Sequence, residues 1–200
     1  NFLLYLHQTA GVKNLIVEGG YSYGYLLNSY VKTGNERILE KALSVAPICP
    51  ENMRTMYKRI HSYNKQIEEK DRINVYGIEI KHSPRLALQV LNIKIPKKPL
   101  PKAIRKSLKK AQDLHQSSYI DDRQVQRMFK QLHKDIRKRE SAFKDFLGDN
   151  FETVKMIVDN TVAGYNFNWL SIALSNKTWR VREDQMYVNF LQIQGELQKG

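Results

Sequence analysis

The spacing of apolar residues divides the chain into predicted helices and two predicted strands. Apolar positions recur at helical spacing over most of the chain, whereas the stretches at 13–18 and 73–79 have the composition of strands. Amphipathic helices are predicted at residues 2–10, 21–32, 35–44, 50–69, 83–91, 149–174 and 181–198. Strands that alternate with helices are typical of a parallel sheet, so we expect an α/β fold, a parallel sheet flanked by helices.

Both predicted strands end on a carboxylate. Glu18 follows the apolar residues Leu15-Ile-Val17, and Glu79 ends the second strand. In open α/β sheets ligands bind beyond the carboxyl ends of the strands. A carboxylate buried there costs free energy unless it is paired, and the following Gly19-Gly20 lets the backbone turn sharply beside a ligand. Glu18 is therefore a candidate site residue, although the pattern also suits a helix cap that meets a structural arginine.

The middle of the chain differs in composition from the rest. Residues 97–140 contain 14 Lys or Arg and 5 Asp or Glu, a local charge of +9 out of the total of +13. Pro96, Pro99 and Pro101 mark a boundary before this segment. Two amphipathic helices are then predicted from the apolar residues Ile104, Leu108, Ala111, Val125, Phe129, Leu132 and Ile136. We interpret the segment as a basic helical hairpin inserted into the α/β fold.

The predicted organisation is a single domain in three parts. Residues 1–95 form the first part of the α/β core, residues 96–148 the inserted hairpin, and residues 149–200 the helices that return to the core. Helical patterns begin at Phe2 and continue to residue 198, next to the end of the sequence. We therefore expect a helix-rich fragment of a larger domain, truncated at both ends.

Composition limits the partners that the chain can have. Two hundred residues, 42 % of them hydrophobic, suffice for a buried core, but no apolar run approaches the roughly 20 residues that span a bilayer. The basic segment has no glycine-rich phosphate loop, zinc-finger spacing or aromatic ribonucleoprotein motif. We expect a solvated face, no specific nucleic-acid partner and no membrane span. The sequence indicates neither a compartment nor an oligomeric state.

The histidines and the single cysteine do not form a metal-binding pattern. No two histidines have the His-x-x-x-His spacing, and Cys49 has no cysteine partner, so no metal and no cofactor are expected. His82, three residues beyond Glu79, is the one histidine predicted near the strand ends. The remaining histidines lie in predicted helices and are expected on the surface: His7, His61, His115 and His133.

Three short motifs occur in order along the chain. The strand that ends at Glu18 is followed by Tyr25-Leu-Leu-Asn-Ser-Tyr30, the second strand contains Val75-Tyr-Gly-Ile-Glu79, and the last helix contains Arg182-Glu-Asp-Gln-Met-Tyr-Val-Asn189. This series resembles the erythromycin esterase-like family, within the broader Tiki and haem-uptake-like hydrolase group. Glu79 and Glu183 stand where that family has aspartates.

The resemblance implies hydrolysis of an ester or related bond in a small-molecule substrate by an activated water. Glu18 is then the expected catalytic residue, and the expected substrate-binding residues are Tyr21, Glu79, His82 and Arg182. Arg182 would position a carboxylate or stabilise an oxyanion. The resemblance also implies histidine-bearing strands outside these 200 residues. The alternative is a non-catalytic binding or scaffold module whose basic hairpin meets an acidic partner.

Overall fold

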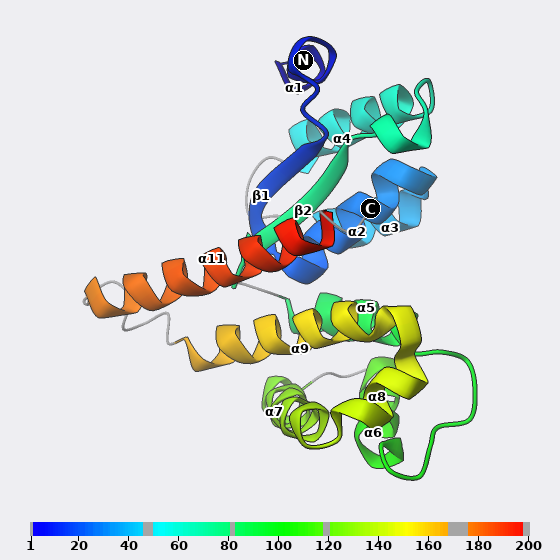
Figure 1. Cartoon of the computed structure of the whole chain (residues 1–200), viewed down its shortest axis with the longest axis vertical. Helices are drawn as coiled ribbons and strands as arrows, with labels where there is room; N and C mark the ends of the chain where they lie inside the picture. Colours follow the sequence, from blue (N-terminus) through cyan, green and yellow to red (C-terminus); the bar gives the residue numbers. More distant parts are fainter. Residues whose placement is uncertain (1, 46–49, 81–82, 118–120, 168–175, 198–200) are drawn as a thin grey trace.

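The computed structural model describes residues 2–45, 50–80, 83–117, 121–167 and 176–197. They form helices around a two-stranded parallel sheet, β1 (Asn14–Gly20) and β2 (Asn74–Glu79), as predicted (Figure 1). The helices are α1 (Phe2–Ala10), α2 (Tyr21–Thr33), α3 (Glu36–Leu43), α4 (Pro50–Asn64), α5 (Pro84–Lys94), α6 (Arg105–Gln116), α7 (Asp122–Lys138), α8 (Glu140–Leu147), α9 (Phe151–Asn166) and α11 (Asn176–Leu197), with short 3-10 helices η1 (Glu69–Asp71) and η2 (Gly148–Asn150). Cys49 and His82 lie outside the described residues.

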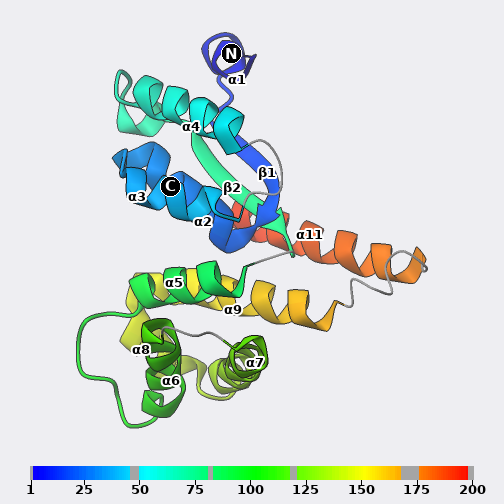
Figure 2. The ribbon, with the colours of Figure 1, turned by 180° about the vertical axis from the view of Figure 1, so that it is seen from behind.

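The elements are arranged in two parts with a long helix between them. The sheet and α1–α4 form one part, α5–α9 form the other, and α11 runs between the sheet and α9 in both views (Figures 1 and 2). Buried apolar residues of the two parts belong to one continuous hydrophobic core. The sheet is therefore packed into a mainly helical molecule.

Helix α2 lies directly against the sheet because glycines face each other at the contact. The helix begins at Tyr21, immediately after β1, and crosses β2. A Cβ atom at Gly24 would overlap the backbone of Gly77, so only glycine permits this close approach. The opposite face of α2 then enters the core with Leu26 and Tyr30 buried.

One edge of β2 faces β1 and the other faces away from it. The N–H of Asn74 donates to the carbonyl of Lys13, just before β1, at 2.8 Å. Successive residues of a strand direct their backbone groups to opposite sides. The backbone groups of Ile73, Val75 and Glu79 therefore face away from β1, on the outer edge of β2.

Asparagine side chains close this outer edge. The Asn64 side chain, at the end of α4, accepts from the Ile73 N–H at 2.9 Å and donates to the Ile73 carbonyl at 2.9 Å. Asn28 of α2 accepts from the Val75 N–H at 3.0 Å. These bonds satisfy backbone groups that a neighbouring strand would otherwise take.

Two expectations about these elements are wrong. Helix α4 ends at Asn64 rather than near residue 69, because the Asn64 side chain bonds the backbone of Ile73 and the chain turns there. Strand β1 is not buried: Ile16 is 37 % exposed, and Leu15 and Val17 are only partly covered. The reason is its position at the edge of a two-stranded sheet, where β1 has little contact with the helices beyond α2.

Helices α6 and α7 occupy the basic segment. All the apolar residues predicted to line these two helices are buried, and they pack with α5 and α9 in the common core. Most of the lysines and arginines of α6 and α7 are exposed. Among the described residues, no helix is long and apolar enough to span a membrane.

Candidate functional site

One arginine joins the two carboxylates at the strand ends. Nη2 of Arg182, near the start of α11, donates to Oε1 of Glu18 at 2.5 Å and also to Oε2 of Glu79. The two carboxylates are thus brought together by a residue more than a hundred positions away from either. These three predicted site residues converge at the carboxyl ends of β1 and β2.

The burial of the two carboxylates differs from the expectation. The Glu18 side chain is 72 % exposed, whereas that of Glu79 is 4 % exposed and that of Arg182 is 13 % exposed. The expectation of a buried carboxylate is therefore wrong for Glu18 and holds for Glu79. The physical reason is that helices pack over β2, while the end of β1 faces solvent.

Glu79 is held in place from several directions. Its Oε1 accepts from the N–H of Ile80 at 2.8 Å, and its carbonyl accepts from Nδ2 of Asn160 in α9 at 3.1 Å. Nδ2 of Asn189 in α11 donates to the carbonyl of Ile78 at 2.7 Å. The end of β2 is thus clamped between α9 and α11, which fixes the position of the buried carboxylate.

The environment of Arg182 stabilises its charged form. Partial burial opposes the charge, but hydrogen bonds and electrostatic attraction from Glu79 and Glu18 outweigh it and raise the pKa of Arg182. The guanidinium carbon also lies 5.6 Å from the centre of the Trp179 ring. Nε of Arg182 is buried and has no hydrogen-bond partner among the described residues. A buried donor without a partner is costly, and such groups call for an explanation.

The arrangement provides one exposed carboxylate on a rigid support. With Arg182 charged, the cluster of Glu18, Glu79 and Arg182 has a formal charge of −1. Glu18 faces solvent and can accept a proton from water, while Arg182 fixes one of its oxygens. Among the described residues, no group of three His, Cys, Asp or Glu side chains is placed to hold a metal ion.

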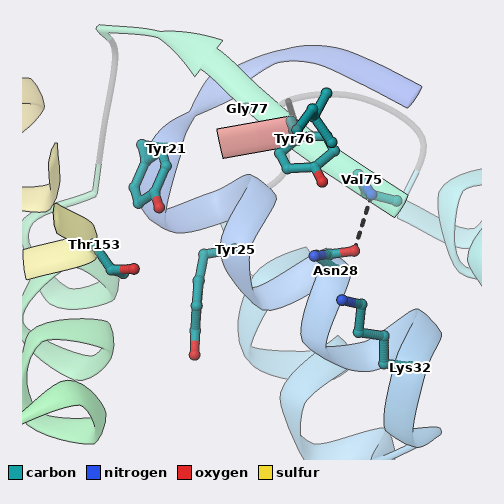
Figure 3. A pocket seen from close by; sticks show the side chains of 9 residues that line it. Tyr21, Tyr25, Asn28, Lys32, Val75, Tyr76, Gly77 and Thr153 are labelled. Carbon is teal, nitrogen blue, oxygen red and sulfur yellow. Dashed lines mark hydrogen bonds between the residues drawn. The ribbon is translucent and has the colours of Figure 1, made fainter. Parts of the chain in front are cut away.

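Tyr21 and His82 are the two remaining predicted site residues. Tyr21 is 6 % exposed and lines a separate cavity of about 300 Å³ beside the outer edge of β2 (Figure 3). His82 lies outside the described residues. Its predicted place near the site therefore stays a prediction.

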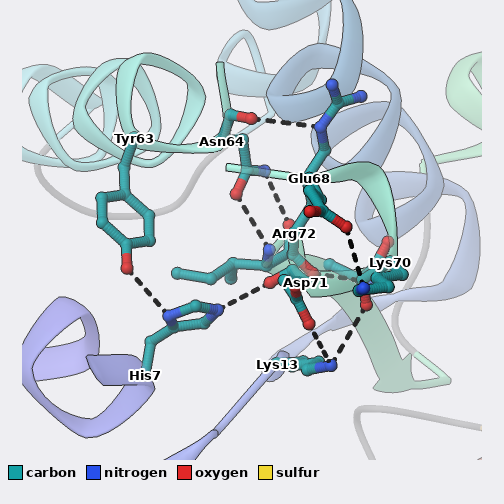
Figure 4. Close-up of polar contacts among 10 residues, drawn as sticks. His7, Lys13, Tyr63, Asn64, Glu68, Lys70, Asp71 and Arg72 are labelled. Atoms are coloured by element: carbon teal, nitrogen blue, oxygen red, sulfur yellow. Dashed lines mark hydrogen bonds and ion pairs between the residues drawn. The ribbon is translucent and has the colours of Figure 1, made fainter. Parts of the chain in front are cut away.

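The histidines expected on the surface are instead partly buried, and three of them, His7, His61 and His133, lie within hydrogen-bond distance of a neighbouring element. His7 is in contact with the turn before β2 (Figure 4), where its Nε2 donates to the carbonyl of Asp71 at 2.6 Å. Because a carbonyl can only accept, Nε2 must hold the proton, and Nδ1 can then accept from the hydroxyl of Tyr63 at 2.9 Å. Nearby, Lys13 and Asp71 form an ion pair at 2.7 Å. This network connects α1 to the rest of the fold.

Two other histidines have similar structural contacts. Nδ1 of His61 lies 3.1 Å from the carbonyl of Val31, and Nδ1 of His133 lies 2.9 Å from Asp159. His115 is also partly buried. The surface expectation is wrong for these helices because each histidine faces a neighbouring element.

Sequence reasoning missed the asparagines that support the strand. Asn28 and Asn189 belong to the quoted motifs, but their side chains bond the backbone of β2. The motif spacing could have indicated them. Asn160 and Asn64 lie in helices without any such pattern, and nothing in the sequence distinguishes them from surface asparagines.

Two solved structures have a similar fold. No protein-family model matches the sequence, and no curated protein matches it. A protein from Bacillus cereus superposes with a TM-score of 0.68 at 17 % identity, over 96 % of this chain and 48 % of its own. A second Bacillus cereus protein, named as a succinoglycan biosynthesis protein, superposes with a TM-score of 0.63 at 15 % identity, over 97 % of this chain and 48 % of its own. At these identities the likeness establishes the fold alone, and the chain spans about half the length of each structure.

Proposed function

We propose that this chain contributes a hydrolase site of the erythromycin esterase-like type, which cleaves an ester or related bond of a small molecule with an activated water. The observation that supports it is the contact of Arg182 with both Glu18 and Glu79 at the carboxyl ends of the strands. This is the place where open α/β sheets bind ligands. The three residues also belong to the three motifs that resemble that family.

The roles of the residues follow from their burial. Glu18 is the proton acceptor for the attacking water, because it is the exposed carboxylate and is oriented by Arg182. Glu79 holds Arg182 in position through the bond between their side chains, and Glu79 does not touch the substrate. Arg182 has the oxyanion role, because its charged guanidinium lies at the carboxyl ends of both strands.

The proposal also covers the place of the basic segment in the fold and the strands that flank this chain. Residues 96–148, which include α6 and α7, are an insertion in the α/β fold, and the catalytic histidines implied by the family resemblance belong to flanking strands. The greater length of the two similar structures supports this, because each has room for a second half. Activity is therefore expected of a longer polypeptide that includes the flanking sequence.

The experiment measures hydrolysis of 4-nitrophenyl acetate and of a macrolide lactone by that longer polypeptide. Glu18→Gln should lower kcat by about 10²-fold or more, the scale for loss of one acid–base group, while lowering the free energy of unfolding by no more than about 1 kcal/mol. The matched control is Glu51→Gln, because Glu51 is also exposed and is paired with an arginine, Arg54. Equal activity of the Glu18 and Glu51 variants would contradict the proposal.

A second candidate function rests on the exposed charge of α6 and α7. Their apolar faces are buried while most of their lysines and arginines face solvent, which favours a binding module for an acidic partner. Binding of polyglutamate should then fall as salt rises and should weaken when Lys106 and Lys110 are replaced by glutamine. Unchanged binding by that double variant would exclude this surface.

A further inference from the structure

The cavity beside β2 lies apart from the carboxylate cluster and has its own polar groups. It is lined by one face of α2, by residues 75–77 of β2, and by Thr153 of α9 and Leu197 of α11 (Figure 3). Its volume is about 300 Å³, at the lower end of the range for small-molecule sites. A ligand the size of one substituted ring could occupy it.

A single face of α2 supplies the side chains that define the cavity. Tyr21, Tyr25, Asn28 and Lys32 follow each other at helical spacing along one side of α2, which begins at the buried Tyr21. The face changes along the helix from aromatic to polar to cationic. The cavity thus has an apolar end and a positively charged end.

The amide of Asn28 has a fixed orientation. Its Oδ1 accepts from the Val75 N–H at 3.0 Å, and because only the oxygen can accept, the amide cannot be reversed. Nδ2 of Asn28 then points into the space between Asn28 and Tyr25 (Figure 3). No hydrogen bond of Nδ2 to another described residue is found. The structure therefore presents a preorganised donor to the cavity.

No described residue neutralises the positive charge beside this donor. The ammonium of Lys32 lies next to the Asn28 amide (Figure 3) and forms no ion pair with a described residue. On the other side, Nζ of Lys94 lies 5.0 Å from the centre of the Tyr25 ring and donates to the neutral side chain of Asn150. Two ammonium groups thus act on the cavity without an acidic partner among the described residues.

From these contacts we propose that the cavity is a binding site for a small organic anion made of a ring and one oxyanion group. The oxyanion accepts from Nδ2 of Asn28 and from Nζ of Lys32, and the ring lies against Tyr25. A fixed amide donor next to an ammonium that has no acidic partner among the described residues favours an anion over a neutral molecule. This site is separate from the proposed hydrolase site and does not depend on it.

The test is an amide NMR titration of the 200-residue chain with phenyl phosphate, which combines a ring and an oxyanion. The amides of Val75, Tyr76 and Gly77 should shift and saturate, and the affinity should fall with added salt. Lys32→Gln should weaken binding about tenfold, the effect of losing one charged contact. Lys65→Gln, at another exposed lysine, should leave the affinity unchanged.

A second variant tests the amide donor without removing the support of β2. Asn28→Asp keeps an oxygen for the Val75 N–H but replaces the donor with a negative charge, so it should abolish phenyl phosphate binding in a folded protein. Inorganic phosphate should bind more weakly than phenyl phosphate, and benzyl alcohol should not bind. The inference is overturned if benzyl alcohol binds as tightly, or if neither Lys32→Gln nor Asn28→Asp weakens binding.

Discussion

Replacing Glu79 by glutamine should destabilise the fold, because it leaves Arg182 without its buried partner. Removing one member of a buried ion pair costs about 3–5 kcal/mol when the remaining charge is uncompensated. Here Glu18 still bonds Arg182, and the glutamine keeps an oxygen for the Ile80 N–H. The expected loss is therefore smaller, about 2–3 kcal/mol in the free energy of unfolding.

Glu18→Gln is the matched control, because Glu18 bonds the same arginine nitrogen. Its side chain is 72 % exposed, so water screens the pair, and exposed ion pairs contribute only about 0.2–1 kcal/mol. We expect a loss within that range. The two variants change the same chemical group, and only the burial of the carboxylate differs.

The assay is urea unfolding of the 200-residue chain, followed by far-ultraviolet circular dichroism. The midpoint should shift for Glu79→Gln with an unchanged slope, which would indicate a change in stability alone. Adding Arg182→Met to Glu79→Gln should recover part of the loss, because the arginine charge that lost its buried partner is then removed. Equal losses for the Glu18 and Glu79 variants, or no loss for Glu79→Gln, would refute this reasoning.

Three further predictions concern the support of the strand and one histidine. Asn64→Ala should lower the free energy of unfolding in urea by about 1–3 kcal/mol, because buried backbone groups of Ile73 lose their partners. Burial lowers the pKa of His115 below 6.5, and the positive charge of Lys41 lowers it further by a smaller amount. The folded state therefore binds this proton less readily than the unfolded state, so stability should rise with pH from the lowered pKa up to 6.5, and His115→Gln should reduce that rise. In a hydrogen-exchange experiment, the Val75 amide should be better protected than the Ile16 amide, because Asn28 bonds it. Asn28→Ala should remove this difference. Equal protection of the two amides in the unaltered chain would contradict the directions assigned to them.

Most helices and both strands could be predicted from the sequence because their signals are local. Apolar spacing determines the buried face of α2 and α7, and the proline at the start of α5 marks its first turn. Motif order also brought Glu18, Glu79 and Arg182 together as candidates. These properties depend on neighbouring residues or on a recognised pattern.

Burial at the site could not be predicted in the same way. Glu18 and Glu79 both end an apolar strand, and the sequence around each is similar in character. Which of them is buried depends on helices α9 and α11, whose residues lie far away in the chain and bond the end of β2. The burial of these two carboxylates is thus a property of tertiary packing, and the local pattern around them does not distinguish one from the other.

The two edges of the sheet also differ for a reason that lies in tertiary contacts. Ile73, Val75 and Glu79 direct backbone groups to the outer edge of β2, where asparagine side chains from α4, α2 and α9 bond them. On β1, the same alternation directs the backbone groups of Ile16 outward, and no bond from another described residue is found there. Since a strand can join a sheet only where backbone groups are free, an added strand would find its partners on β1. The exposure of Ile16 is consistent with this, because an added strand would bring covering elements over that apolar side chain.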